Sequence, residues 1–347
     1  MLLNISVIIF LAAILGWHDT NRRELKKEMI PSLKGANGWI NTKPLALGDL
    51  HGKVVLIDFW TYSCINWRRT LPYLREWAAK YKDQGLVVIG IHTPEFSFER
   101  SIENVSRSVI EMGISYPVAL DNNFDIWRSF KNQYWPALYL IDATGKIRFQ
   151  KFGEGDYQEC ELQIRKLLSK DLVGETVSAT STHPPQPDGY ETAADWDHLR
   201  SPETYLGYNR SDGFASPQLM IANEPILYSL PWRLELNQWA LSGEWVVGEE
   251  GNVMTRKKGK ITYRFHARDL HLVMGSGKGE MPLKFRILID GHPPGPDHGL
   301  DVDKDGNGTL TLPRMYQLVR QIGTVVDREF QIEFLDSNVD VYVFTFG

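Results

Sequence analysis

The sequence predicts an α/β fold followed by an all-β jelly-roll sandwich, and three observations lead to that prediction. The first half alternates buried strand patterns with amphipathic helix patterns. The second half contains strand patterns at regular spacing, divided by Gly and Pro, without a convincing amphipathic helix. A stretch rich in Ser, Thr and Pro separates the halves, and 347 residues suit two domains at about 150 residues each.

Composition excludes several classes of protein. Hydrophobic residues make up 43% and charged residues 23%, which excludes a wholly disordered or fibrous chain. The net charge of -5 gives no global basic field, so we expect no nucleic-acid partner. Two cysteines exclude a disulfide scaffold and an all-cysteine metal site, but they leave room for a single reactive thiol.

The N-terminal segment, residues 1–28, is predicted to be a hydrophobic anchor or signal with its charged flank. Its apolar run, residues 2–17, is shorter than the ~20 residues of a spanning helix and long for a signal-peptide core. The basic cluster that follows would, taken alone, favour a cytoplasmic flank (Arg22, Arg23, Lys26 and Lys27). Orientation, and the choice between anchor and cleaved signal, stay open.

The first domain, predicted over residues 29–173, has the order β-α-β-α-β-β-α. Almost continuous apolar runs predict buried parallel strands at residues 54–59 and 86–91. Apolar residues at helical spacing predict three helices, at residues 71–81, 102–112 and 162–168. A turn at residues 142–145 joins a last pair of strands into a hairpin, at 137–141 and 147–149. Right-handed crossovers then place helices on both faces of one sheet.

Cys64 lies where the first strand pattern turns into the first helix pattern. The free N–H groups and the dipole at a helix N-terminus stabilise a thiolate, so this position predicts a thiol of lowered pKa that acts as a nucleophile. The alternative is a buried, inert cysteine, which is the usual state of a lone Cys. The strand-to-helix position favours the reactive thiol.

At these residues the chain resembles the thioredoxin superfamily, and within it the TlpA-like branch and DipZ-type proteins. Asp58 matches the buried proton-handling acid of the family, Pro72 the proline of its first helix, and Trp135-Pro136 its cis-proline loop. The resemblance covers most of residues 31–170 through six segments: DFWTYSCINW, GIHTPEFSFE, YPVALDN, NQYWPA, LIDATGKIRF and FGEGDY.

One position departs from the family. DipZ-type proteins carry Cys-x-x-Cys, whereas Trp67 stands at the second cysteine position here. Cys160 is the other thiol, and a helix packed on the sheet is not expected to bring it within the ~7 Å that a disulfide requires. Cys64 is therefore a monothiol that an external thiol resolves, a binder of thiols or peptides without turnover, or a remnant of a decayed site.

The resemblance implies roles for the residues around Cys64. Asp58 and Glu95 are expected to handle protons during thiol exchange, against the alternatives of a structural acid and an exposed loop carboxylate. The expected substrate-docking residues are Trp60, Trp67, Trp135 and Pro136. No cofactor is required, and the expected partners are protein or small-molecule thiols and disulfides.

Residues 174–200 are predicted to be a Pro-rich linker, and residues 201–347 a β-sandwich. Strands are expected at residues 261–265, 270–274, 285–289, 317–320, 330–334 and 339–346. This half resembles the carbohydrate-binding-module-like part of DipZ-type proteins through TYLGYNRSDGF, LSGEWVVG, FHARDLHLVMG, DVDKDGNGTL, YQLVRQ and VYVFTFG. A glycan partner is therefore a hypothesis for this domain.

Two possible sites belong to the second domain. Asp301, Asp303 and Asp305 have the spacing of a calcium loop, but Leu312 replaces its closing acid, so a solvated acidic hairpin is the alternative. Three tryptophans are candidates for sugar stacking or for the core (Trp232, Trp239 and Trp245). His292 and His298 flank a Pro-Gly loop without completing a metal site.

The function predicted from the sequence is that of an envelope thiol–disulfide oxidoreductase-like protein with one nucleophilic thiol. The alternative is a non-catalytic protein of thioredoxin-like fold that binds peptide or glycan. The multi-span, electron-delivering membrane domain of DipZ-type proteins has no counterpart in this sequence. The resemblance thus places both domains outside the cytoplasmic membrane and implies a separate multi-span electron donor.

Overall fold

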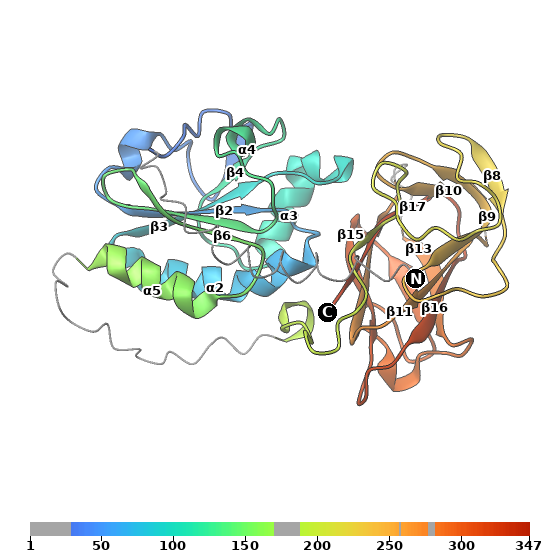
Figure 1. The fold of residues 1–347 in the computed structure, drawn as a ribbon. Helices are drawn as coiled ribbons and strands as arrows, with labels where there is room; N and C mark the ends of the chain where they lie inside the picture. Colours follow the sequence, from blue (N-terminus) through green and yellow to red (C-terminus); the bar gives the residue numbers. More distant parts are fainter. Residues whose placement is uncertain (1–28, 170–187, 257, 277–281) are drawn as a thin grey trace, which may run out of the picture.

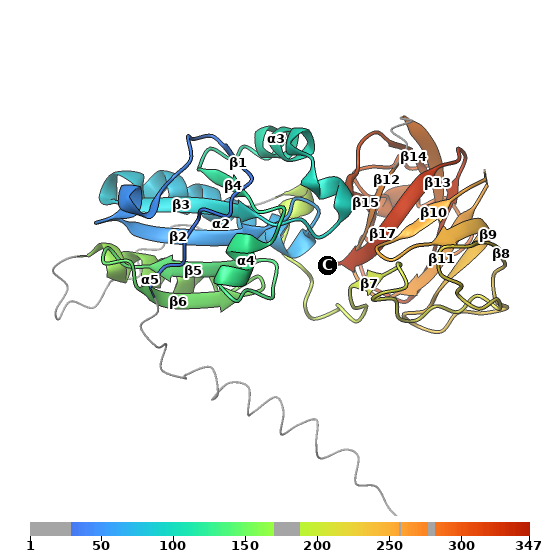
Figure 2. The same cartoon turned by 90° about the horizontal axis from the view of Figure 1, so that it is seen from above.

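The computed structural model describes residues 29–169, 188–256, 258–276 and 282–347, which form two domains packed side by side (Figures 1 and 2). The predicted anchor, residues 1–28, and most of the predicted linker lie outside the described residues. Of the helices in the described part, none has the length and apolar character needed to cross a membrane.

The first domain is a six-stranded sheet of order β1-β4-β3-β2-β5-β6 with helices on both faces. Its strands are β1 (Gly38–Ile40), β2 (Val54–Trp60), β3 (Leu86–His92), β4 (Val118–Leu120), β5 (Ala137–Ile141) and β6 (Ile147–Phe152). Its α-helices are α2 (Ile65–Tyr81), α3 (Ile102–Glu111), α4 (Asp125–Ser129) and α5 (Tyr157–Leu168). Short 3-10 helices are η1 (Leu47–Leu50), η2 (Lys82–Gln84) and η3 (Ser97–Arg100).

Strand β2 organises this domain because its alternate side chains enter two different cores. Val54, Leu56 and Trp60 contact the core under α2 and α5, and the intervening residues enter the core on the other face, with α4. β2 pairs with β3 in parallel and with β5 antiparallel, so it lies in the middle of the sheet. The predicted thioredoxin-like α/β fold is confirmed. The strands β1 and β4 and the helix α4 were not predicted, because three to five residues are too few to show a period.

The second domain is an antiparallel sheet of eleven strands that curls into two layers around one core. The strands are β7 (Thr204–Tyr205), β8 (Pro225–Tyr228), β9 (Trp239–Val247), β10 (Asn252–Met254), β11 (Lys260–Phe265), β12 (Asp269–Gly275), β13 (Leu283–Ile289), β14 (Asn307–Leu310), β15 (Arg314–Arg320), β16 (Arg328–Phe334) and β17 (Val339–Phe346). Short 3-10 helices are η4 (Gly189–Glu191) and η5 (Gly295–Asp297). The predicted β-sandwich is confirmed, and its jelly-roll form stays a prediction.

Strand β9 links the two layers at Gly243. Residues before Gly243 pair with β11, and residues after it pair with β8 and β10. Gly243 has a φ of 96°, and a Cβ there would lie 3.0 Å from the Cα of Gly259. A side chain is therefore disfavoured at the point where the strand passes from one sheet to the other.

The two domains meet where α2 begins. A small core joins Ile65 and Phe96 of the first domain to strands β12, β15 and β17 of the second. Arg69 of α2 donates to the carbonyl of Phe346 at 3.0 Å, and Arg75 pairs with Glu191 at 2.6 Å. The N-terminal turns of α2 are thus covered by the sandwich.

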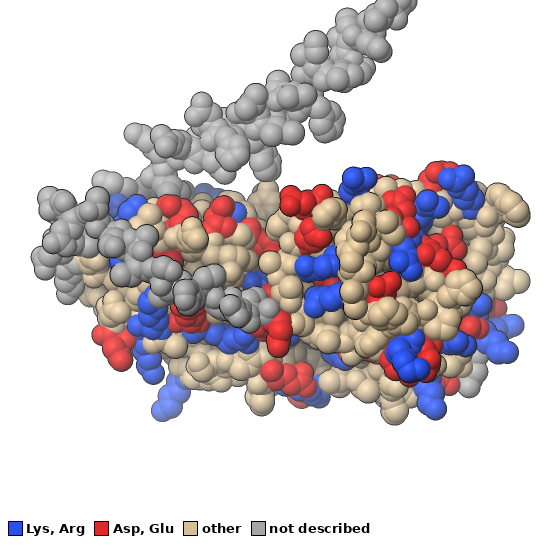
Figure 3. Space-filling view, turned by 90° about the horizontal axis from the view of Figure 1, so that it is seen from below, with Lys and Arg blue, Asp and Glu red and all other residues tan. Residues whose placement is uncertain are grey.

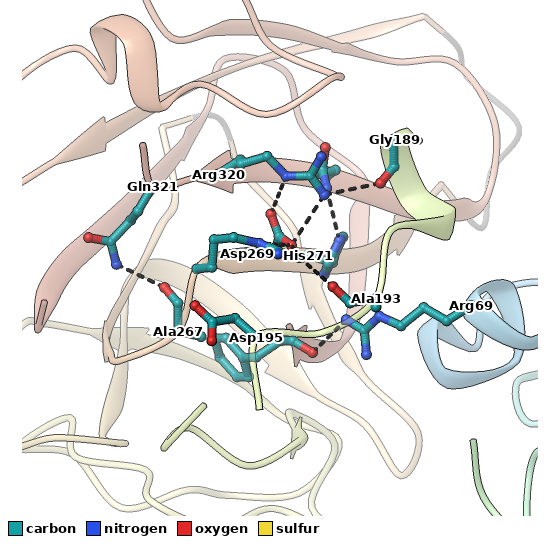
Figure 4. A network of polar contacts seen from close by, with 12 residues as sticks. Arg69, Gly189, Ala193, Asp195, Ala267, Asp269, His271, Arg320 and Gln321 are labelled. Carbon is teal, nitrogen blue, oxygen red and sulfur yellow. Dashed lines mark hydrogen bonds and ion pairs between the residues drawn. The ribbon is translucent and has the colours of Figure 1, made fainter. Parts of the chain in front are cut away.

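A buried acid of the second domain, Asp269, orients two arginines that bind the chain segment leading into this domain. Asp269, 1% exposed, pairs with Arg268 and Arg320, each at 2.6 Å. These arginines donate in turn to the carbonyls of Ala193 and Gly189, and Figure 4 shows Arg69 reaching toward the same region from α2. On the face drawn in Figure 3, acidic and basic side chains are interspersed rather than gathered into a patch of one sign.

Candidate functional site

Cys64 is the N-cap residue of α2, directly after β2 and the turn that follows it. Its Sγ lies 3.9 Å from the carbonyl oxygen of Trp135, and the Trp135–Pro136 peptide bond is cis. The structure therefore brings together the thiol and the proline loop, as the resemblance implied. Cys64 is only 8% exposed, and it packs in the hydrophobic core of the first domain.

The predicted lowering of the Cys64 pKa is wrong for this arrangement. Burial raises the pKa of the thiol well above its usual value, and the charges of Glu203 and Glu95 raise it further. The backbone N–H groups of Trp67 and Asn66 act in the opposite direction, as a helix N-terminus should, but they are outweighed. The thiol is therefore protonated at neutral pH in this conformation.

Asp58 and Trp67 lie together beneath the thiol. The indole Nε1 of Trp67 donates to Oδ2 of Asp58 at 2.9 Å, and the ring stacks on Trp60 at a centroid distance of 4.2 Å. All three side chains are fully buried, and burial raises the pKa of Asp58 to about 7. Trp60 and Trp67 therefore cannot touch a substrate directly in this conformation, whereas half-buried Trp135 keeps exposed surface.

Glu95 faces the second domain rather than solvent. Its Oε1 accepts from Arg210 at 3.0 Å and from the hydroxyl of Tyr205 at 2.7 Å. The same hydroxyl lies 2.9 Å from Oε2 of Glu203. One hydroxyl carries one hydrogen, so the contact with both carboxyl groups is satisfied when one carboxyl is protonated and donates to the hydroxyl oxygen.

Glu203 is the member of this cluster whose pKa is raised. Glu95 forms the ion pair with Arg210. The residue Glu203 as a whole is exposed, but its carboxyl group loses hydration in the folded chain. This loss of hydration, and to a smaller extent the charge of Glu95, raises the pKa of Glu203. Glu95 and Glu203 thus meet through Tyr205 at the domain interface, near enough for their charges to act on Cys64.

Glu99 is a second buried acid that the sequence reasoning missed. It accepts from the hydroxyl of Ser63 at 2.6 Å and from the backbone N–H groups of Glu95 and Phe96 at 2.7 and 2.9 Å. Burial raises its pKa to about 7. It fixes the loop that carries Glu95 against the turn that carries Cys64. The sequence signal that could have identified Glu99 is its place in GIHTPEFSFE, one of the six segments that carry the resemblance.

Cys160 does not approach Cys64 as a partner. It lies on α5, it is 3% exposed, and both cysteines are free thiols. Burial raises its pKa to about 12, so it is unreactive at neutral pH. Cys64 is thus the thiol that the fold places at the family's reactive position.

The three aspartates of the possible calcium loop are bound by other groups of the protein. Asp301 forms an ion pair with Arg314 at 2.7 Å and accepts a hydrogen bond from the backbone N–H of Gln317. Asp303 accepts hydrogen bonds from the backbone N–H groups of Asp305 and Asn307. Asp305 pairs with Lys304. No cluster of three metal-binding side chains occurs in the part of the chain that the structure describes.

The three tryptophans named as candidates for sugar stacking or for the core differ in their exposure to solvent. Trp239 and Trp245 are completely buried, since they lie at inward positions of β9, and this corrects the hypothesis for both. Trp232 is fully exposed.

Both domains have recognisable relatives. Residues 27–150 match the AhpC/TSA family, and residues 201–347 match the family described as Thioredoxin like C-terminal domain. Protein DipZ of Mycobacterium tuberculosis is 42% identical over 269 residues, which is 76% of this chain and 36% of DipZ. The chain therefore spans about a third of the length of these curated relatives, and the resemblance to DipZ-type proteins is confirmed.

The first domain is also similar to thiol–disulfide oxidoreductases of single-domain size. Thiol-disulfide oxidoreductase YkuV of Bacillus subtilis is 28% identical over 147 residues, which is 42% of this chain and 97% of YkuV. A solution structure of a thioredoxin-like protein in the oxidised form is 28% identical and covers 41% of this chain and 95% of its own, with a TM-score of 0.39.

Proposed function

We propose that this protein carries out thiol–disulfide exchange with Cys64 as its single nucleophile. The observation that supports it most directly is the position of the thiol at the start of α2, 3.9 Å from the carbonyl oxygen of Trp135 in the cis-proline loop. Similarity to relatives named thiol–disulfide oxidoreductases gives the same indication. No cofactor takes part.

The exchange proceeds through a mixed disulfide. The Cys64 thiolate attacks one sulfur of a substrate disulfide, so the substrate S–S bond breaks, a Cys64–substrate bond forms, and the departing thiolate takes up a proton. Trp67 supplies no second thiol. An external thiol therefore attacks the mixed disulfide, forms a new disulfide with the substrate sulfur, and releases Cys64.

Two acids at the domain interface move the protons of this cycle. Glu95 accepts the proton of Cys64, and Glu203 supplies one to the departing thiolate through Tyr205. Asp58 acts on the reactivity of the Cys64 thiol indirectly, through its hydrogen bond with the indole of Trp67. Because Cys64 is 8% exposed, attack requires the sandwich edge to withdraw from α2.

The partners and the compartment follow from the resemblance. We propose that the substrate is an extended peptide disulfide that lies along the Trp135–Pro136 edge, over the support of Trp60 and Trp67. We propose further that both domains work outside the cytoplasmic membrane, with a separate multi-span membrane donor. A reporter fused after Gly347 that is active only outside the cytoplasm tests the compartment, and an inactive fusion contradicts it.

The decisive experiment compares wild type with Trp67→Cys in a disulfide-reduction assay with added dithiol, and uses Trp67→Ser as the matched control. We expect faster turnover in Trp67→Cys than in wild type or Trp67→Ser, in which the added dithiol has to release Cys64, and before dithiol is added we expect a Cys64 mixed disulfide in wild type, detected by mass spectrometry. Both variants remove the same buried indole, so the comparison separates the new thiol from the cavity. Absence of any Cys64 adduct in folded wild-type protein overturns the proposal.

A non-catalytic binding role is the second candidate. The buried, protonated thiol and the indole in place of the second cysteine favour it. Partners captured equally by wild type and Cys64→Ser would support binding without chemistry. Partners lost in Cys64→Ser would support exchange.

A further inference from the structure

A cavity of about 470 Å³ lies between the two domains, and its lining does not include Cys64, Glu95 or Glu203. The first domain contributes Tyr62, Arg68 and Met112, and the second contributes Tyr190, Arg314 and Met315. This volume is in the range of cavities that hold small organic molecules. The walls combine aromatic and thioether surface with cationic groups, which suits a ligand that has an apolar body and a charged end.

Arg68 is the unpaired cation of this cavity. Its guanidinium lies 5.3 Å from the ring centroid of Tyr190, and its Nε is buried without a hydrogen-bond partner. No ion pair of Arg68 occurs among the residues that the structure describes. The residue is half-buried, and loss of hydration lowers its pKa. A buried donor without a partner is costly, so a ligand that supplies acceptors is favoured here.

The neighbouring charges are already balanced. Arg314 pairs with Asp301 at 2.7 Å and donates to the hydroxyl of Tyr190 at 3.0 Å. Arg75 pairs with Glu191 at 2.6 Å, just beyond Arg68. Glu111 also lines the cavity, but it is exposed, so water screens its charge. Arg68 is thus the lining cation that forms no ion pair within the described part of the chain, although the charge of Glu191 acts on it from nearby.

We propose that this interdomain cavity binds a small organic carboxylate, with the carboxylate on Arg68 and the apolar part against Tyr62, Met112 and Met315. A planar guanidinium matches a carboxylate with two parallel hydrogen bonds. A monoanion neutralises the single free charge, whereas a phosphate dianion leaves a negative charge uncompensated beside Asp301. The proposal is independent of thiol chemistry.

Calorimetric titration of the full chain tests it, with benzoate as the probe, benzamide as its neutral isostere, and inorganic phosphate as a third arm. We expect benzoate to bind, and benzamide and phosphate to bind at least about tenfold more weakly, the factor of one charge-assisted hydrogen bond. Arg68→Met should weaken benzoate binding by a similar factor. Exposed Arg286 provides the matched control, Arg286→Met, which should bind as wild type does.

Three binding results would overturn the proposal or one of its parts. No benzoate binding up to about 20 mM, where even a weak site would respond, overturns the proposal. Equal binding of benzoate and benzamide overturns the role of Arg68 even if Arg68→Met fails to fold, since that comparison needs no variant. Stronger binding of phosphate overturns the assignment to a carboxylate. Because Cys64→Ser protein can be used throughout, these results do not depend on the proposed exchange activity.

Discussion

Arg69 forms a buried ion pair with Glu154 inside the first domain and a hydrogen bond to Phe346 of the second, and its replacement tests how strongly stability depends on the ion pair. Its side chain is 2% exposed, lies 3.0 Å from Oε1 of Glu154, and donates to the carbonyl of Phe346. Coulomb's law gives roughly 5 kcal/mol for unit charges at this separation in an effective dielectric constant near 20. Removing one partner of a buried pair costs about 3–5 kcal/mol, because the other charge remains unpaired.

We therefore expect Arg69→Met to lower the free energy of unfolding by about 3–5 kcal/mol in urea titrations. The Tm should fall by roughly 2–4 °C for each kcal/mol. Glu154→Gln is the matched control, because it removes the negative charge and leaves the Arg69–Phe346 bond in place. The double variant Arg69→Met/Glu154→Gln should regain most of the loss, since no uncompensated charge remains.

A loss below about 1 kcal/mol in Arg69→Met, which is the value of an exposed pair, would refute this reasoning. It would mean that water reaches the pair and screens it. Failure of the double variant to recover stability would assign the loss to packing of the arginine stem rather than to charge.

Three further predictions concern the thiol, its buried acid and the sandwich. In a Cys160→Ser background, the rate of Cys64 alkylation by iodoacetamide should keep rising beyond pH 9 without a plateau, because burial and the Glu203 charge raise the thiol pKa. Glu203→Gln should shift this rise to lower pH. A plateau near pH 7 contradicts the raised pKa. Burial raises the pKa of Asp58 to about 7 from 3.8, so its folded form holds a proton that the unfolded chain loses, and stability should fall as pH rises between these values. Asp58→Asn should remove that part of the fall, measured by urea unfolding at several pH values, and an unchanged pH profile would exclude the raised pKa. Gly243→Ala should destabilise the chain by about 1–3 kcal/mol in the same assay, because the φ of 96° disfavours a side chain, and a neutral effect would show that β9 can relax.

The sequence was sufficient for both folds because their long elements have clear periods. Residues 54–59 and 86–91 appear as β2 and β3, and the helix predicted from Leu71 to Tyr81 is the main part of α2. Elements of three residues, such as β1 and β4, show no period and were missed. Strand β9 was missed as a strand because Gly243 interrupts its alternation at the change of sheet.

The site was predicted only where one domain defines it. Cys64, Asp58 and the Trp135–Pro136 loop are local to the first domain, and their motifs identified them. Glu203, Tyr205 and Arg210 reach Glu95 from the second domain, more than one hundred positions away in sequence. A single sequence does not say which loops of two domains meet, so these partners could not be predicted.

The direction of the Cys64 pKa shift could not be predicted either, and the magnitudes of the two opposing effects explain why. A helix N-terminus stabilises a negative charge by about 0.3–1 kcal/mol, which is less than one pKa unit at 1.36 kcal/mol per unit. Full burial of an ionisable group can raise its pKa by roughly 3–5 units. Cys64 is only 8% exposed, so burial outweighs the helix terminus and the thiol stays protonated. The charge of Glu203, from the second domain, raises the pKa of the thiol further, so part of the shift depends on contact between the domains.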